Sequence, residues 1–305
     1  VDRLLSENLR DEMLHDNRKR QEELATSYRN RQAKLVPYDE ARRQSFQTDW
    51  PQVDIPRPSF IGAKTLLDFD LNRLLEVIDW SPFFWAWEMK GKYPSILQDE
   101  KLGEEATKLF EDAQRRLTHL IDSRKLTARG VYGFWPAAAE GDDVILFADE
   151  NRQTPITRFH FLRQQWVRQG QSDFRCLADY IAPLDSGRKD YLGAFVVTTG
   201  IGAEEEAARF QAEHDDYNSI MVKALADRLA EAFAEWLHRQ VRHDWEYGRD
   251  EQLTVDDLIR EGYRGIRPAP GYPACPDHTE KRALFDLLKA ENEIDVHLTE
   301  SFAML

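Results

Sequence analysis

The sequence is poor in several features that mark large classes of protein. It has only two cysteines, Cys176 and Cys275, which are too few for a disulfide framework and fit a protein of the reducing cytoplasm. No apolar run reaches the roughly 18 residues of a membrane-spanning helix, and residues 1–6 lack the cationic and apolar regions of a signal peptide. Acidic residues outnumber basic ones, with 55 Asp and Glu against 41 Lys and Arg. A net charge of −14 argues against general nucleic-acid binding, which needs clustered Lys and Arg.

The chain does have the means to form a substantial hydrophobic core. Its 305 residues include 42% hydrophobic side chains, among them 8 Trp, 16 Phe and 10 Tyr. This length suits one large domain or two small ones.

Residues 1–47 differ in composition from the rest. They are rich in Arg, Lys, Glu and Gln, and their few apolar side chains recur at helical spacing: Leu4, Leu5, Leu9, Met13 and Leu14. So narrow an apolar stripe predicts a helix that forms only by docking on something else. Prolines at 37, 51, 56 and 58 then indicate a linker. We therefore predict a helical, proline-containing interdomain linker over residues 1–58 and a compact domain over residues 59–305.

Hydrophobic spacing in the compact part predicts both helices and strands. Helices are expected at residues 71–78, 104–120, 203–243 with a break near 214, 256–262 and 281–292. Strands are expected at 130–136, 143–148, 158–162 and 191–199, the last as an apolar run in a central sheet position. The absence of regular βαβ alternation favours α+β over a doubly wound fold. We expect a twisted, mainly antiparallel sheet flanked by helices, preceded by the helical linker.

A proline-rich segment, residues 267–281, is the most informative stretch. Four prolines between 267 and 276 remove four backbone donors and fix four φ angles, so neither a helix nor a central strand can form. The segment predicts a stiff, extended loop that presents its carbonyls and side chains to a ligand at little entropic cost. Arg267 offers a planar fork for a carboxylate or phosphate, Tyr272 a ring for stacking, and Gly271 close backbone approach. A rigid connector without a ligand is an equally good interpretation of the chemistry alone.

Two other sequence patterns resemble a dinucleotide-binding turn and a Cys/His site, but the surrounding residues do not complete either motif. The turn Gly200-Ile201-Gly202-Ala203 lacks the third glycine of a dinucleotide site, and Glu204, Glu205 and Glu206 would stand where the pyrophosphate belongs. Cys275 and His278 could form half of a zinc site or a nucleophile and its base. Only Cys176 remains to complete a metal site, and residues so close in a proline-locked loop rarely face each other. We expect packing to be the role of Cys275, no metal site and no catalytic group.

Four acidic residues are candidates for a binding site. Asp79, next to a run of aromatic residues, suits either a helix-end partner of a backbone donor or a counter-ion for a ligand cation; the residues alone favour the first. Asp227 and Glu231 lie four apart on one face of the long predicted helix, where a solvated acidic stripe is the simpler interpretation. Glu261, shortly before the proline loop, is a candidate of the same kind as Asp227 and Glu231.

Short motifs spread over roughly residues 60–305 resemble one family, in that family's order. The proline segment RPAPGYPACPDHTEK resembles the signature of the C-terminal, S-adenosylmethionine-binding activation domain of cobalamin-dependent methionine synthase. Further motifs of the resemblance are IDWSPFF at 78–84, GKYP at 91–94, RGVYG at 129–133, CLADY at 176–180, DYLGAF at 190–195, HDDYN at 214–218, residues 223–235 and LTESFAM at 298–304.

The resemblance implies roles for individual residues. It places Asp79 on the methionyl part of S-adenosylmethionine, Glu231 at the ligand groove, and Arg267, Ala269 and Tyr272 among the ligand-binding residues. It places Asp227 toward a docked cobalamin-binding domain. The family continues past Met304 into a segment with a Tyr-Phe pair and a His-Pro dipeptide that adds ligand contacts, so the chain resembles a C-terminally truncated domain cut from a longer polypeptide.

The implied function is repair of a methyltransferase. The family's cobalamin occasionally oxidises to inactive cob(II)alamin, and rescue couples reduction by flavodoxin or a similar flavoprotein to methyl transfer from S-adenosylmethionine. The implied partner is the cobalamin-binding domain of the same cytoplasmic polypeptide; the cobalamin and zinc of the full enzyme have no ligands in this chain. A stand-alone module of the same fold that reactivates a separate corrinoid protein is one alternative. A Cys/His hydrolase using Cys275 is another.

Overall fold

The computed structural model describes residues 10–30, 34–168 and 170–305, which form two compact units. One unit contains the described residues of 1–47 and 163–176, and the other contains residues 48–162 and 177–305. Three leucines of the predicted N-terminal stripe, Leu4, Leu5 and Leu9, lie outside the described residues.

The smaller unit joins the N-terminal segment to a distant stretch of chain. It contains α2 (Arg10–Asn30) and α3 (Tyr38–Arg43). Between residues 10 and 26, only Met13 and Leu14 are partly buried, as expected for a narrow stripe. Isolated bridges pair Leu35 with Trp166 and Ser45 with Phe174. The predicted linker is therefore paired with residues 163–176, which no sequence pattern singled out.

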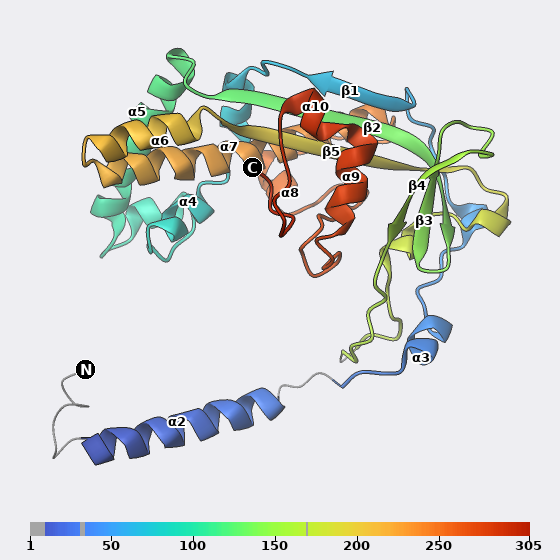
Figure 1. Cartoon of the computed structure of the whole chain (residues 1–305), viewed down its shortest axis with the longest axis horizontal. Helices are drawn as coiled ribbons and strands as arrows, with labels where there is room; N and C mark the ends of the chain where they lie inside the picture. The colour runs from blue at the N-terminus through green and yellow to red at the C-terminus, as the bar shows by residue number, and fades with distance from the viewer. Residues whose placement is uncertain (1–9, 31–33, 169) are drawn as a thin grey trace. The chain divides into compact units, whose positions relative to one another are not determined.

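The larger unit is built on an antiparallel five-stranded sheet (Figure 1). Its strands are β1 (Gly62–Leu66), β2 (Thr127–Glu140), β3 (Asp143–Phe147), β4 (Pro155–His160) and β5 (Asp190–Ile201). The long strand β2 pairs with β1, β3 and β5, and β4 pairs with β3. The α+β class and the mainly antiparallel sheet are thus confirmed.

The predicted central position of residues 191–199 is wrong. Among the described strands β5 pairs only with β2, so β2 is the central strand. The apolar run of β5 arises because helices cover the strand: α7 packs against it, and so do α9 and α10. Burial by helices and burial between strands leave the same apolar pattern in a sequence.

Helices of very different length surround the sheet. The α-helices of this unit are α4 (Ser81–Ala86), α5 (Gly103–Asp122), α6 (Ala203–Ala212), α7 (Asp216–Asp244), α8 (Val255–Ile259), α9 (Glu280–Leu288) and α10 (Ala290–Ile294). Short 3₁₀ helices are η1 (Trp50–Gln52), η2 (Leu71–Val77), η3 (Ser95–Gln98), η4 (Leu177–Tyr180) and η5 (Leu184–Ser186). No helix in the described part of the chain is long and apolar enough to cross a membrane.

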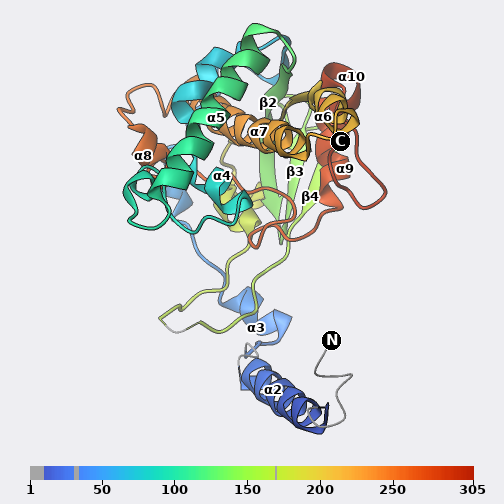
Figure 2. The ribbon, with the colours of Figure 1, turned by 90° about the vertical axis from the view of Figure 1, so that its left-hand side faces the viewer.

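The helix boundaries follow local chemistry. The break predicted near residue 214 is confirmed: His214 has a φ of 59°, and the side chain of Asp215 caps α7 by accepting the Asn218 N–H at 3.0 Å. The α6 and α7 helices then lie side by side (Figures 1 and 2). The single helix predicted over 281–292 is two helices, because Lys289 adopts a left-handed φ of 52° between α9 and α10. Residues 71–77 form a 3₁₀ helix rather than the expected α-helix.

The core lies between α7 and one face of β2. Phe134 faces α7 and belongs to the main hydrophobic cluster, whereas its neighbour Trp135 faces Ala283 and Leu287 of α9 on the opposite side. Phe233 of α7 is fully buried, stacks on Phe69 with ring centroids 4.4 Å apart, and lies over Gly130 of β2. The α7 helix is therefore fixed to the sheet by apolar packing, and its remaining faces are free to carry polar groups.

Removing one ring from this contact tests how much α7 depends on it. We expect Phe233→Ala to lower the free energy of unfolding by about 3–5 kcal/mol, because it removes a buried ring and leaves a cavity. Ile220→Ala is the matched control on the same helix, since Ile220 is 52% exposed and should change stability by less than about 1 kcal/mol. Urea denaturation followed by circular dichroism measures both; equal losses would contradict the packing described here.

Candidate functional site

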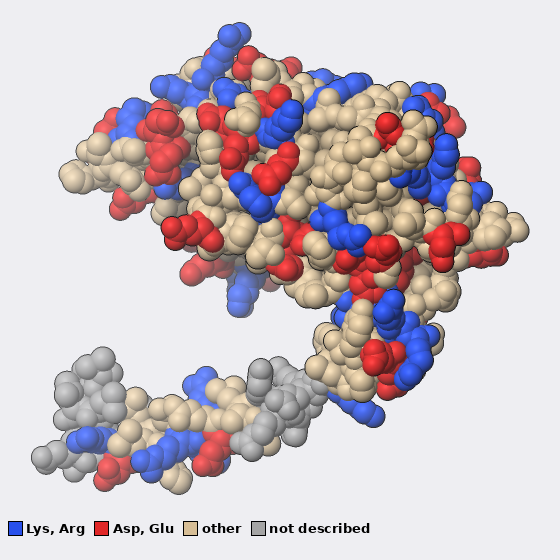
Figure 3. All heavy atoms as spheres, turned by 45° about the vertical axis from the view of Figure 1, so that its right-hand side comes forward, with Lys and Arg blue, Asp and Glu red and all other residues tan. Residues whose placement is uncertain are grey.

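An acidic face runs along α7 and ends beside the proline loop. Asp227, Glu231 and Glu235 are spaced four residues apart and therefore share this face. Asp227 and Glu231 are exposed, whereas the side chain of Glu235 is only 15% exposed. Elsewhere, on the face of the larger unit that Figure 3 shows, acidic and basic side chains are interspersed.

Glu235 holds the arginine that begins the proline loop. Arg267 Nη2 donates to Glu235 Oε1 at 2.5 Å, across 32 residues of sequence. The Arg267 side chain is only 22% exposed. Its Nη1 and the Oε2 of Glu235 are both buried without a protein hydrogen-bond partner. The pair therefore carries an unused donor and an unused acceptor.

A second guanidinium, that of Arg242, belongs to the same helix as Glu235, and its charge and that of Arg267 both act on His238. Arg242 is fully buried; its Nε donates to Glu251 Oε2 at 2.9 Å, and its Nη1 donates to His238 Nδ1 at 3.0 Å. The guanidinium also lies 4.2 Å from the ring centre of Tyr263, which packs edge-on against His238. These contacts attach the chain after α7 to the last turns of that helix.

His238 is held in its neutral form. Burial, and then the positive charges of Arg242 and Arg267, lower the pKa of His238 from 6.5 to about 3. The hydrogen bond from Arg242 requires Nδ1 to be an acceptor, so the ring proton belongs on Nε2.

The proline loop is folded back on itself rather than extended as predicted. The Tyr272 N–H donates to Ala269 O at 3.2 Å, the Cys275 N–H to Tyr272 O at 2.9 Å, and the Gly271 N–H to Cys275 O at 2.7 Å. Gly271 has a φ of 105°, and a Cβ there would lie 2.4 Å from the His278 ring, so only glycine fits. The prolines lack the N–H groups that a longer β-ladder would need, and the three local hydrogen bonds close the turn instead. Ala269 and Tyr272 are exposed on it.

Cys275 has the surroundings of a packing residue. It is buried, and burial followed by the nearby Glu280 and Asp277 raises the pKa of its thiol to about 11. Its supposed base is engaged elsewhere, because His278 Nδ1 lies 3.0 Å from Lys281 Nζ. The thiol therefore lacks both the ionisation and the partner of a nucleophile.

Asp79 performs the helix-end role that its residue type favours. Its Oδ1 accepts the Ser81 N–H at 2.9 Å where α4 begins. Among the described residues, no hydrogen bond or ion pair joins Asp79 to Glu231 or Arg267. Glu261 has a φ of 55°, lies in the turn two residues after α8, and is exposed. The structure thus joins Arg267 to α7 directly, while Asp79 stands at the start of another helix, α4, that packs on α7.

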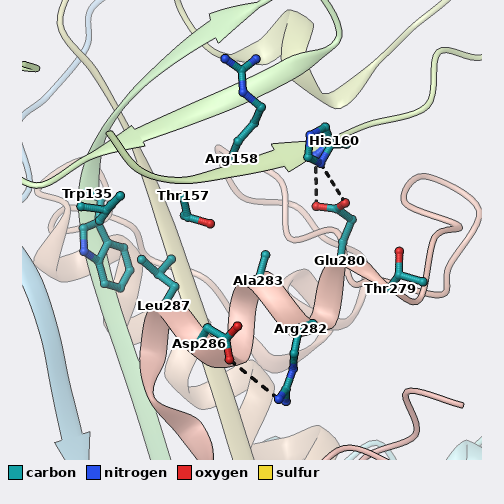
Figure 4. A pocket seen from close by; sticks show the side chains of 11 residues that line it. Trp135, Thr157, Arg158, His160, Thr279, Glu280, Arg282, Ala283, Asp286 and Leu287 are labelled. Atoms are coloured by element: carbon teal, nitrogen blue, oxygen red, sulfur yellow. Dashed lines mark hydrogen bonds and ion pairs between the residues drawn. The ribbon is translucent and has the colours of Figure 1, made fainter. Parts of the chain in front are cut away.

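A cavity of about 600 Å³ lies elsewhere, between β4 and α9 (Figure 4). None of the predicted site residues lines it, and its charged groups already have partners. His160 Nδ1 is 3.3 Å from Glu280, Arg158 bonds to Glu140 and Asp143, and Arg282 bonds to Glu291. We therefore place the candidate site at α7 and the proline loop.

Sequence reasoning missed three members of the cluster beside the proline loop. They are Glu235, His238 and Arg242. The four-residue spacing after Asp227 and Glu231 was a signal for Glu235. Nothing local signals that an arginine will be fully buried beside a histidine, since both types are usually exposed or only partly buried.

Comparison with known proteins identifies the family. Residues 70–305 match the family described as vitamin B12 dependent methionine synthase, activation domain. The chain is also similar to a crystal structure of the MetH reactivation domain bound to AdoHcy. The identity is 49%, the match covers 88% of this chain and 83% of that chain, and the TM-score is 0.85. The chain therefore belongs to the activation-domain family of vitamin B12-dependent methionine synthase, as its motifs predicted.

The neutral His238 makes stability depend on pH. Because the pKa of folded His238 lies below its ordinary value, the unfolded chain takes up the proton first as the pH falls, and stability is lost. From about pH 7 to about pH 5, wild type should lose about 2 kcal/mol more of its free energy of unfolding than His238→Gln loses. Denaturant titrations of both chains across this range measure the difference, and parallel curves would refute the assignment.

Proposed function

We propose that this chain binds S-adenosylmethionine at α7 and the proline loop, and presents its methyl group for reductive reactivation of cobalamin in methionine synthase. The observation that carries the proposal is the Arg267 guanidinium, held against α7 by Glu235 at the start of the proline loop. The support beyond it is the 49% identity to a reactivation domain that binds AdoHcy.

The proposed ligand has a carboxylate and an ammonium group beside its sulfonium, and the first two suit different residues. Arg267 would take the carboxylate, because its planar fork can donate two parallel hydrogen bonds. Asp79 would take the ammonium with the carboxylate oxygen that the Ser81 turn does not use. Ala269 and Tyr272 would contact the ligand from the exposed turn, and Glu231 from the exposed face of α7.

The chemistry asked of this chain is positioning. A sulfonium is already an activated methyl donor, so the protein needs to hold it for in-line transfer rather than supply an acid or base. This agrees with the raised pKa of the buried Cys275 thiol and with the lowered pKa of the buried His238 imidazole. Cobalamin would supply the methyl acceptor, and the described residues of this chain offer no group of three or more His, Cys, Asp or Glu for a metal.

The proposed partners would supply the methyl acceptor and the electron. The cobalamin-binding domain of the same polypeptide would dock against the site, with Asp227 at the contact, and flavodoxin or a similar flavoprotein would supply the electron. Exposed carboxylates suit such docking because charge governs the rate and the orientation of encounter. A cytoplasmic location is part of the same proposal.

Arg267 is the first residue to test. Arg267→Ala should weaken S-adenosylmethionine binding by about 1.5–3 kcal/mol, the usual range for a hydrogen bond to a charged group. Arg267→Lys should recover only part of the loss, because a point charge cannot replace a fork. Isothermal titration calorimetry measures the affinities; equal binding by wild type and Arg267→Ala would reject the site.

Asp79 can be tested without disturbing its turn. Asp79→Asn keeps an oxygen that can accept the Ser81 N–H but removes the negative charge. It should weaken S-adenosylmethionine by about 1–2 kcal/mol and leave methylthioadenosine, which has no ammonium group, nearly unchanged. Competition binding compares the two ligands, and an equal loss for both would mean that Asp79 serves only the turn.

A further inference from the structure

Arg267 belongs to a stretch of chain that offers its side chain little support of its own. Its neighbours Arg264, Gly265, Ile266, Pro268 and Ala269 are exposed, while the Arg267 side chain is mostly buried. A long side chain on such a segment has many rotamers, and fixing it removes entropy. Some group outside the segment must therefore select its position.

Glu235 is the group placed to do so. It belongs to α7, which is packed on the sheet, and its Oε1 lies 2.5 Å from Arg267 Nη2. Among the described residues, no hydrogen bond or ion pair joins Arg267 to the other polar side chains of this cluster. Arg242 repels the Arg267 guanidinium, and His238 is neutral and receives its hydrogen bond from Arg242. Glu251 is engaged by Arg242.

The pair is also incompletely satisfied. One hydrogen bond joins the two residues, and the buried Arg267 Nη1 and Glu235 Oε2 have no protein partner. Unpartnered buried polar atoms are unfavourable, so this arrangement is poor for stability alone and leaves hydrogen-bonding capacity beside the proposed ligand site.

From these contacts we infer that Glu235 is a positioning residue, which acts on the ligand through Arg267 by fixing the orientation of its guanidinium. The inference rests on the proposed function. It predicts that the contribution of Glu235 to binding exists only when Arg267 is present, which a merely structural role for Glu235 does not predict.

A double-mutant cycle on the full 305-residue chain tests the inference. The four chains are wild type, Glu235→Gln, Arg267→Ala and the double variant, each titrated calorimetrically with S-adenosylmethionine. Glu235→Gln should weaken binding about tenfold in the wild-type background and less than about twofold in the Arg267→Ala background. Glu246→Gln is the matched control, because it neutralises a glutamate paired with Arg249 at 3.1 Å on the exposed surface; it should bind like wild type.

The possible outcomes distinguish a failure of the inference about Glu235 from a failure of the proposed function on which it rests. If wild type fails to bind, the proposed function falls, and the inference falls with it. If Arg267→Ala binds weakly but Glu235→Gln binds like wild type, the site stands and Glu235 is not a positioning residue. An equal loss in both backgrounds also overturns the inference, because Glu235 then acts independently of Arg267.

A second variant protects the test from loss of folding, which circular dichroism monitors. Should Glu235→Gln fail to fold, Glu235→Asp enters the same cycle. Glu235→Asp keeps the negative charge, but its side chain is one methylene shorter, which moves the carboxylate away from Arg267. It should weaken binding at least about threefold when Arg267 is present and have no effect in the Arg267→Ala background. Equal effects in the two backgrounds would again refute positioning.

Discussion

The buried guanidinium of Arg242, in the last turn of α7, joins that helix to the segment that follows. A charge without exposure to solvent is tolerated only when hydrogen bonds and opposite charge surround it. Glu251, His238 and the ring of Tyr263 provide contacts of this kind, although Nη2 of Arg242 is buried without a protein hydrogen-bond partner. Because two of the three residues come from the chain after α7, satisfying Arg242 folds that chain back onto the helix. This return places Arg267 over Glu235.

The same cluster links the protonation of one residue to the position of another. A proton on His238 would remove the acceptor that Arg242 uses and add a third positive charge beside Arg242 and Arg267. Acid strong enough to protonate folded His238 would therefore disturb the support of Arg267. The stability of the fold and the position of Arg267 depend on the same network. For each substitution within it, both the stability and the ligand affinity therefore need to be measured.

Structural features that depend on interactions between residues close in sequence could be predicted, whereas those that depend on residues distant in sequence could not. Helix α5 and the break before α7 were predictable because apolar spacing and capping residues act locally. The proline loop was predicted to be extended, and it folds back through hydrogen bonds of its own. The position of β5 was not, because an apolar run does not record whether helices or strands bury it. The residues of the proposed site, Arg267 among them, came from motif resemblance. The pairing of Arg267 with Glu235 spans 32 residues and depends on how the chain returns after Arg242, which no local pattern encodes.

If the proposed site binds S-adenosylmethionine, its charge balance would favour the methyl donor over the product that remains after transfer. Glu235 is neutralised by Arg267, whereas Asp227 and Glu231 are exposed, and the structure shows no ion pair for either among its described residues. A ligand bound along this face would thus meet net negative charge. S-adenosylmethionine has a positive sulfonium and its demethylated product a neutral thioether, and an exposed carboxylate about 4 Å from a cation contributes on the order of 1 kcal/mol. Such a difference would hold the donor and release the product without any change of fold, which is the behaviour that a repair reaction requires.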